Sequence, residues 1–245
     1  MSKHSIRVKA VIAYDGSAYS GFQKQTRTKN TITQTIEKAL KALHIHSPII
    51  GSGRTDAGVH ATGQVIHFDI PAYWIDLKKL KLNLNRQLYD IHCKHISLVK
   101  HDFHARFHAK KRIYRYVFKT KQPSLFEQKF IAYYASFDTT LLTEALKTFE
   151  GKHDFDFFRK TGTETHTSIR EIYRTNYIQR GDYHFIYFCA NGFLRSQVRM
   201  MVDAAISCAQ DKINLVQLQG QLHCQFKYTS KLAPPEGLYL AKILY

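Results

Sequence analysis

A short loop around residue 56 carries the side chains best suited to chemistry. Asp56 stands two residues after Arg54, and Gly53 and Gly58 flank the pair. Glycine permits positive φ angles and lets a ligand approach the backbone closely. The guanidinium of Arg54 can keep the Asp56 carboxylate ionised and hold it in place. Such a carboxylate is suited to act as a nucleophile or a base, although a lone Arg-x-Asp is usually an ordinary surface ion pair.

The residues around this loop extend the pattern well beyond two side chains. Residues 53–65 read Gly-Arg-Thr-Asp-Ala-Gly-Val-His-Ala-Thr-Gly-Gln-Val, and this stretch resembles the catalytic segment of the TruA-type tRNA pseudouridine synthases. Further segments resemble the same family in the same order, and they are residues 14–23, 102–107, 112–116, 191–199 and 236–240. The resemblance therefore spans nearly the whole chain.

The resemblance implies an activity and a role for particular residues. Members of this family isomerise uridine to pseudouridine in the anticodon stem-loop, at tRNA positions 38 to 40, without a cofactor. Asp56 matches the nucleophile, and Arg199 matches the basic residue that forms an ion pair with it. Tyr114 matches the residue for base stacking or proton transfer, and a flipped-out uridine needs such an aromatic face. Taken alone, Tyr114 in an alternating strand would more often be a core residue. Arg54 is then expected to reach the RNA backbone.

The charge of the chain favours a polyanionic partner. The sequence has 36 Lys and Arg against 19 Asp and Glu, a formal net charge of +17 with His neutral, and such an excess favours nucleic acid over a merely solvated basic face. Residues 103–126 contain no acid, and tyrosines interleave with the cations there, as expected where phosphates and bases are both contacted. The predicted substrate-binding residues are Tyr114, Arg54, Arg106, Lys110, Lys111, Arg112, Arg115 and Arg195.

The cysteines and apolar segments indicate a soluble cytoplasmic protein. The four cysteines, at positions 93, 189, 208 and 224, form no Cys-x-x-Cys motif, so neither a disulfide framework nor a zinc ribbon is expected. No signal peptide is visible, and no apolar run approaches the length of a membrane span.

The histidines suggest a metal site, but we expect none. His101, His104 and His108 are close in sequence, as are His92, Cys93 and His95. The first group, however, overlaps a segment that resembles a family element without a metal site. The zinc deaminase signature is also missing from the sequence.

Hydrophobic periodicity predicts an α+β first half. Residues 7–14 alternate as a strand, Thr31 and Gln34 form a candidate capping box for a helix, and strands at 48–51 and 59–70 bracket the Asp56 loop. Asp76 can cap a second helix, and residues 91–99 read as a strand. The order β-α-β-β-α-β is that of a ferredoxin-like unit.

The second half appears in the sequence as a repeat of this order. It has a strand at 112–119, a helix between Asp138 and Gly151, a hairpin at 169–190, a helix at 194–210 and a strand at 238–244. We therefore predict two tandem ferredoxin-like halves with mostly antiparallel sheets that meet at a basic central cleft. Residues 1–102 would carry the catalytic Asp loop, and residues 103–245 the base-stacking Tyr and the partner Arg. The resemblance further implies a homodimer.

Two other functions and two departures from the family pattern stay open. Ferredoxin-like units also form non-catalytic RNA-binding modules, although their aromatic RNP1 pattern is missing here. A carboxylate-based glycoside hydrolase would need a second acid near Asp56, where the sequence is acid-poor. Tyr89 stands where the family commonly has proline, and Asp203 stands where it commonly has glycine. Asp203 raises a question about close packing of its helix and about the dimer contact.

Overall fold

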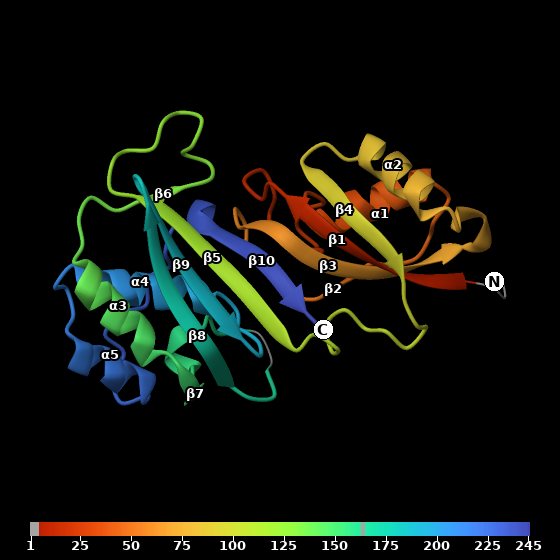
Figure 1. Ribbon diagram of the computed structural model, residues 1–245. Helices are drawn as coiled ribbons and strands as arrows, with labels where there is room; N and C mark the ends of the chain where they lie inside the picture. The colour runs from red at the N-terminus through yellow and green to blue at the C-terminus, as the bar shows by residue number, and fades with distance from the viewer. Residues whose placement is uncertain (1–4, 163–164) are drawn as a thin grey trace. The chain divides into compact units, whose positions relative to one another are not determined.

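The computed structural model describes residues 5–162 and 165–245, which form two compact units (Figure 1). The first unit contains the described residues up to Lys110 together with Leu240–Tyr245, and the second contains Lys111–Tyr239. We expected the halves to be 1–102 and 103–245. Residues 103–110 and the chain's last six residues lie instead in the first unit, so the chain leaves the first unit once and returns to it.

The first unit has the predicted order of elements. These are β1 (Ser5–Tyr14), α1 (Ile32–Ala42), β2 (Ile50–Gly51), β3 (His60–Pro71), α2 (Leu77–Gln87) and β4 (Ile91–Leu98), with a short 3₁₀ helix η1 (Ala72–Trp74) before α2. β1 pairs antiparallel with β3 and β4, and β2 pairs antiparallel with β3. The strand order β4-β1-β3-β2 with two helices is a ferredoxin-like α+β arrangement.

Local sequence signals place these elements. Every second residue of β1 from Val8 to Tyr14 is buried, as the alternation predicted. Thr31 caps α1, because its hydroxyl accepts the Gln34 backbone N–H at 3.3 Å. The other half of the predicted capping box is absent, since the Thr31 N–H donates to the Lys29 carbonyl at 3.1 Å.

The second unit follows the predicted order with additions. It contains β5 (Lys111–Lys119), β6 (Ala132–Tyr133), α3 (Thr139–Thr148), β7 (Gly151–Asp154), β8 (Ile169–Arg180), β9 (Tyr183–Ala190), α4 (Gln197–Ala209) and α5 (Leu215–Leu222). Two 3₁₀ helices, η2 (Asp156–Phe158) and η3 (Pro235–Gly237), precede β10 (Leu238–Leu244), which crosses from the second unit into the first at Leu240. The strands β5-β9-β8-β7 pair antiparallel in that order, and β6 pairs parallel with β5.

Two helix boundaries in this unit show where local signals succeed and fail. Asp138 caps α3 as predicted, since its carboxylate accepts the N–H groups of Thr140 and Leu141 at 2.7 and 2.8 Å. The helix predicted at 194–210 is wrong at its start, because Ser196 has a left-handed φ of 59° and α4 begins at Gln197. That backbone turn leaves Arg195 outside the helix.

Helices cover one face of the strands of the second unit, and on the other face of β5 Val117 is also buried, with 6% of its surface exposed. Tyr114, Tyr116 and Phe118 of β5 are buried, whereas Lys111 and Arg115 are exposed or half-buried. α3, α4 and α5 gather on one side of these strands, where α3 contacts both β8 and α4 (Figure 1). Successive side chains of a strand point to opposite faces. The even-numbered residues of β5 therefore lie on the packed face with Tyr114, and the odd-numbered residues lie on the opposite face.

The imidazole of His67 on β3 gives a prediction about the stability of the first unit in acid. It is buried, its Nδ1 accepts the Ala105 N–H at 3.1 Å, and burial lowers its pKa to about 4. An unfolded chain protonates histidine near pH 6.5 and therefore binds more protons than the folded chain between about pH 6.5 and 4. The free energy of unfolding should therefore fall as pH drops through this range. Urea unfolding at a series of pH values measures it.

The matched variants separate this histidine from the others. His67→Gln keeps an acceptor for the Ala105 N–H but cannot be protonated in this range, so it should flatten the acid loss. His46→Gln, at an exposed position, should keep it. An acid loss of equal steepness in both variants would rule out His67 as the source.

Candidate active site

The Asp56 loop lies in the first unit, between β2 and β3. Asp56 is half-buried and Arg54 is exposed. Thr55 between them is buried, with its hydroxyl 2.8 Å from the Tyr14 hydroxyl and its carbonyl accepting the Phe22 N–H at 3.0 Å. The residue next to the carboxylate is therefore fixed to β1 and to the segment that follows it.

Gln64, a fully buried residue of β3, joins the two ends of the same loop. Its Oε1 accepts the Ser52 hydroxyl at 2.7 Å and the Val65 N–H at 3.1 Å, and its Nε2 donates to the Gly53 carbonyl at 2.9 Å. A buried amide satisfied on both its oxygen and its nitrogen specifies one loop geometry. The sequence analysis missed Gln64, and its signal was a polar residue within the buried strand that follows the loop.

The glycines around the loop serve different purposes. Gly58 has a φ of 75°, as expected. Gly53 does not: its φ is not positive, and a Cβ built there would meet nothing within 4 Å. Gly21, with a φ of 108°, is the position without room, since its Cβ would lie 2.9 Å from the Thr55 carbonyl oxygen. The backbone of the family-like segment 14–23 therefore lies directly against the backbone of the Asp56 loop.

His60, the first residue of β3, ties this segment to the other side of the loop. Its buried Nδ1 accepts the Gly16 N–H at 3.0 Å and lies 3.3 Å from a carboxylate oxygen of Asp15. Tyr19 adds a backbone contact, because its carbonyl accepts the Gly58 N–H at 3.4 Å. The residues before and after Asp56 are consequently both hydrogen-bonded to the segment 14–22.

Tyr114 lies in the second unit on the packed face of β5. Its side chain is 8% exposed, and its ring meets the Phe193 ring edge to face, with centroids 5.1 Å apart. Two residues earlier, the Arg112 guanidinium donates to the Asn191 carbonyl at 2.6 Å. The family-like segments at 112–116 and 191–199 are thus brought together in one place.

Arg199 is half-buried in the first turn of α4. Its Nε donates to the Ala233 carbonyl at 2.6 Å, and its own carbonyl accepts the Ala233 N–H at 3.1 Å. Burial raises the pKa of Tyr116 and of Tyr134, and the positive charge of Arg199 opposes both shifts. The guanidinium is therefore anchored in partly desolvated surroundings, where a charge interacts more strongly than in water.

The remaining basic residues are divided between the two units. Arg106 and Lys110 are exposed in the first unit, with the Arg106 guanidinium 5.7 Å from the centre of the Phe107 ring. Arg195 is exposed in the second unit and donates to the Thr161 carbonyl at 3.3 Å. Lys111 and Arg115 belong to the face of β5 opposite Tyr114 and Arg112. The cations of the acid-free run that lie in β5 are therefore divided between the two faces of that strand.

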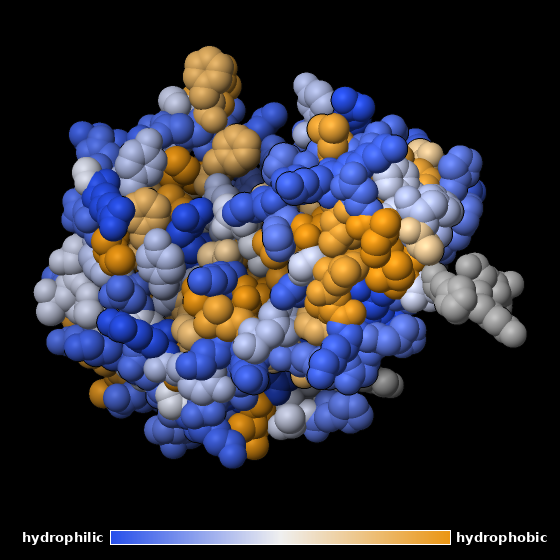
Figure 2. Space-filling model, turned by 45° about the vertical axis from the view of Figure 1, so that its right-hand side comes forward, coloured by the Kyte–Doolittle hydropathy of each residue, from blue (hydrophilic) through white to orange (hydrophobic). Residues whose placement is uncertain are grey.

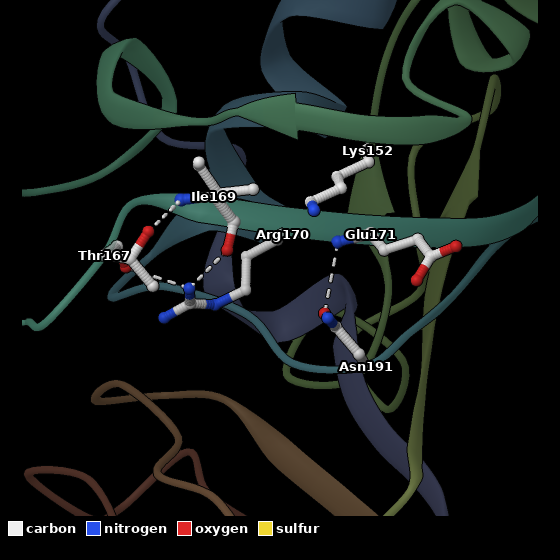
Figure 3. Close-up of a pocket in the computed structure, with 6 residues that line it drawn as sticks. All are labelled: Lys152, Thr167, Ile169, Arg170, Glu171 and Asn191. Atoms are coloured by element: carbon white, nitrogen blue, oxygen red, sulfur yellow. Dashed lines mark hydrogen bonds between the residues drawn. The ribbon is translucent and has the colours of Figure 1, made fainter.

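The pocket in Figure 3 also lies in the second unit and has a volume of about 380 Å³. It is lined by Lys152, Thr167, Ile169, Arg170, Glu171 and Asn191. The Arg170 guanidinium donates to the carbonyls of Thr167 and Ile169, and the Glu171 N–H donates to the Asn191 side chain (Figure 3). None of the predicted site residues lines it, so this pocket is not the candidate active site.

Among the described residues, no group of three or more His, Cys, Asp or Glu could hold a metal ion. Two of the imidazoles singled out in the sequence accept backbone N–H groups: His104 Nδ1 accepts those of Arg106 and Phe107, and His108 Nδ1 accepts that of His104. Within residues 5–162 and 165–245, no helix has the length and apolar character needed to cross a bilayer. Hydrophilic residues cover much of the face shown in Figure 2, with separate apolar patches among them.

Comparison with known proteins gives a consistent result. The family described as tRNA pseudouridine synthase matches residues 10–108 and 145–245. A tRNA pseudouridine synthase A of Helicobacter hepaticus is 40% identical over 97% of this chain and 98% of its own length. The proteins of the same name from Campylobacter jejuni and Lactococcus lactis subsp. cremoris are 36% and 39% identical, each over 98% of this chain and at least 97% of their own length.

The fold and the site define an α+β protein with ferredoxin-like architecture and a carboxylate held on a braced loop. The matches cover most of the chain, including the Asp56 loop and the α4 segment with Arg199. The chain belongs to the tRNA pseudouridine synthase family, whose members are isomerases.

Substitution of Gly21 should disturb the Asp56 loop without touching the carboxylate. Gly21→Ala meets both an unfavourable φ and the Thr55 carbonyl, so we expect a loss of about 2 kcal/mol or more in the free energy of unfolding. Folded protein should also react more slowly, because the loop must shift. Denaturant unfolding and single-turnover kinetics measure the two effects.

Gly181→Ala is the matched control. Gly181 also has a positive φ, 57°, but a Cβ there would meet nothing within 4 Å. It should cost about 1 kcal/mol from backbone strain alone and leave the reaction rate unchanged. Equal effects on rate in the two variants would contradict the supporting role of Gly21.

Proposed function

We propose that this protein isomerises uridine to pseudouridine in the anticodon stem-loop of tRNA, at positions 38 to 40. The observation that carries the proposal is the family match across both units, which includes the braced Asp56 loop. The formal charge of +17 supports a polyanionic substrate. Four free cysteines and a tRNA substrate fit a cytoplasmic location.

The reaction requires one nucleophile and no redox chemistry. The C–N glycosidic bond of uridine breaks, the uracil turns, and a C–C bond joins it again to the same ribose. Asp56 is the nucleophile in our proposal, and its loop has the rigidity that such a group needs. The bound base and sugar stay within the site throughout, so no cofactor enters this scheme.

Arg199 and Tyr114 complete the proposed site. The ion pair between Arg199 and Asp56 would keep the carboxylate charged when RNA excludes water. Tyr114 would stack against the flipped uridine or transfer a proton through its hydroxyl. The family motif supports both roles. Contacts of Arg54 and Arg112 with the RNA backbone belong to the same proposal.

A homodimer is part of this proposal because the family resemblance of the sequence implies one. Two copies related by a two-fold axis would enlarge the basic surface that meets the tRNA. Sedimentation of the protein with and without tRNA measures the stoichiometry directly.

Asp56→Asn should abolish pseudouridine formation while the affinity for tRNA stays within a few-fold of that of the original protein. The amide cannot act as the nucleophile, whereas binding depends on cationic side chains. Mapping of pseudouridine by position in unmodified tRNA measures the product, and filter binding measures the affinity. Turnover above about 1% of normal would remove Asp56 from this role, since loss of a nucleophile usually costs several orders of magnitude. If the original protein binds tRNA but forms no product, the non-catalytic RNA-binding module is the better description.

Arg199→Gln should lower the single-turnover rate about a hundredfold or more, because a buried carboxylate that loses its cation is strongly destabilised. Arg199→Lys should recover part of the rate, since it keeps the charge but loses the forked geometry. Thermal melts control for the lost bond to Ala233. Equal rates for the Gln and Lys variants would show that the charge of Arg199 does not serve the reaction.

Tyr114→Phe separates the hydroxyl from the ring. The burial of Tyr114 makes Tyr114→Ala a poor test, because it would leave a cavity that costs about 3 to 5 kcal/mol. Tyr114→Phe should keep stability and stacking, and it should slow catalysis if the hydroxyl transfers a proton. Tyr116→Phe is the control: its hydroxyl donates to the Pro234 carbonyl at 3.1 Å, so stability should fall and the rate per folded molecule should not. The reverse pattern would return Tyr114 to a purely structural role.

A further inference from the structure

The second unit has a sheet face that the proposed site does not use. Ile113–Lys119 of β5, Tyr183–Cys189 of β9 and Arg174–Arg180 of β8 are in antiparallel register, and their odd-numbered residues in β5 and β9 pair with the even-numbered residues of β8. Paired residues point to the same face of a sheet. These positions therefore form one continuous surface on the side opposite Tyr114, Tyr116 and Phe118.

Cations stand on this face, and one carboxylate reaches its edge, where Glu127 accepts the Tyr183 hydroxyl at 2.5 Å. Arg115, Lys119, Arg174 and Arg180 lie in the paired positions, and none of those positions holds Asp or Glu. Arg174 and Arg180 are exposed. Lys119 is partly neutralised from outside the face, since Glu127 lies 3.2 Å away. Three arginines remain to give the surface its charge.

Aromatic rings follow one another along the central strand of this face. Tyr183, Phe185 and Tyr187 of β9 are half-buried or exposed. The Tyr183 and Phe185 rings are stacked with their centroids 6.5 Å apart, and Tyr187 follows two residues further along the strand. Tyr183 lies between Lys119 and Arg180 in the register. Rings spaced along a strand between cations can meet successive bases of one nucleic acid strand.

Contacts at the margins show that cations and rings already lie together. The Lys119 ammonium is 4.6 Å from the centre of the Tyr183 ring, and the Lys111 ammonium is 4.9 Å from that of Tyr173. The Arg115 guanidinium is 4.9 Å from the Tyr239 ring, and its buried Nε has no hydrogen-bond acceptor among the described residues. A donor left over at such a position is suited to an incoming acceptor such as a phosphate.

We propose that this face of β5, β9 and β8 binds a single-stranded segment of RNA, with phosphates at Arg174 and Arg180 and bases against Phe185 and Tyr187. Ferredoxin-like RNA-recognition domains use their open sheet face in this way, and stacking with basic side chains needs no fixed sequence motif. A second copy of the chain fits less well, because it would set arginines against arginines. The surface is separate from the Asp56 site, so the inference goes beyond the proposed reaction.

The test compares two charge-matched double variants of the full chain. Arg174→Gln with Arg180→Gln removes two cations from the face, and Lys78→Gln with Arg86→Gln removes two exposed cations from α2. The probe is a fluorescently labelled oligouridylate ten nucleotides long, with anisotropy measured at several KCl concentrations. The first double variant should bind at least about tenfold more weakly at low salt. The slope of log affinity against log salt should fall by about 1.4, from two lost contacts to a single strand. The α2 variant should leave the slope nearly unchanged.

A ring variant tests the stacking half of the proposal. Tyr187→Leu should weaken binding about fivefold or more and keep the salt slope, because stacking releases no counterions. Pseudouridine formation at saturating tRNA should be unchanged in both face variants, which separates this result from any failure of the proposed reaction.

Other outcomes overturn the inference. Affinity and slope like those of the original protein, in the arginine double variant and in Tyr187→Leu, would show that RNA does not use this face. A change in sedimentation with unchanged RNA affinity would identify the face as an interface between two copies of the chain.

Discussion

The backbone contact between Phe22 and Thr55 determines where the candidate nucleophile can be. Thr55 precedes Asp56, and its carbonyl accepts the Phe22 N–H while its hydroxyl meets Tyr14. A carboxylate on a free loop would sample many positions, and the entropy of fixing it would oppose the reaction. Here that entropy is lost during folding, when β1 and β3 pair. The contact also explains why Gly21 has no room for a side chain: the two backbones lie against each other.

In the second unit, the alternation of side chains along β5 determines which residues can act together. Arg112 and Tyr114 fall on the packed face of β5, and Lys111 and Arg115 fall on the other. A basic cluster in sequence is therefore two half-clusters in space, one beside Phe193 and Asn191 and one on the open sheet face. Charge alone indicates a nucleic acid partner but not which surface meets it. The register of β5 with β9 shows which residues share each face.

Much of the fold could be predicted from the sequence, because its signals are local. The alternation from Val8 to Tyr14 and the caps at Thr31 and Asp138 gave elements close to the observed ones, since each depends on residues within a turn or a strand. The start of α4 could not be predicted, because the left-handed backbone at Ser196 is set by the surrounding fold rather than by the serine. Strands as short as β6 carry too few residues for a period to be visible.

The candidate site likewise contains residues that the sequence predicted and residues that it did not. A motif can point to Asp56, Arg199 and Tyr114, because motifs preserve the identity of residues that act on a substrate. The residues that hold the loop, Gln64 and His60, were not predicted, since they act through hydrogen bonds to chain segments that are distant in sequence. A buried polar residue in a strand is informative only when its partner is known.

Asp203 stands where the family commonly has glycine, and its surroundings show how α4 accommodates an acid there. Its carboxyl is half-buried one turn beyond Arg199 in α4, and burial raises its pKa while Lys231 and Lys212 lower it. The question was whether an acid in place of glycine would loosen the helix. Ala204 and Ala205, which follow it, are fully buried, so the helix packs closely with Asp203 at the margin of its buried stripe. The positive charges of Lys231 and Lys212 favour the ionised carboxylate, and the Arg199 backbone and side chain are bound to Ala233. The helix can therefore accept an acid at this position, because Arg199 keeps its hydrogen bonds to the Ala233 segment with Asp203 one turn away.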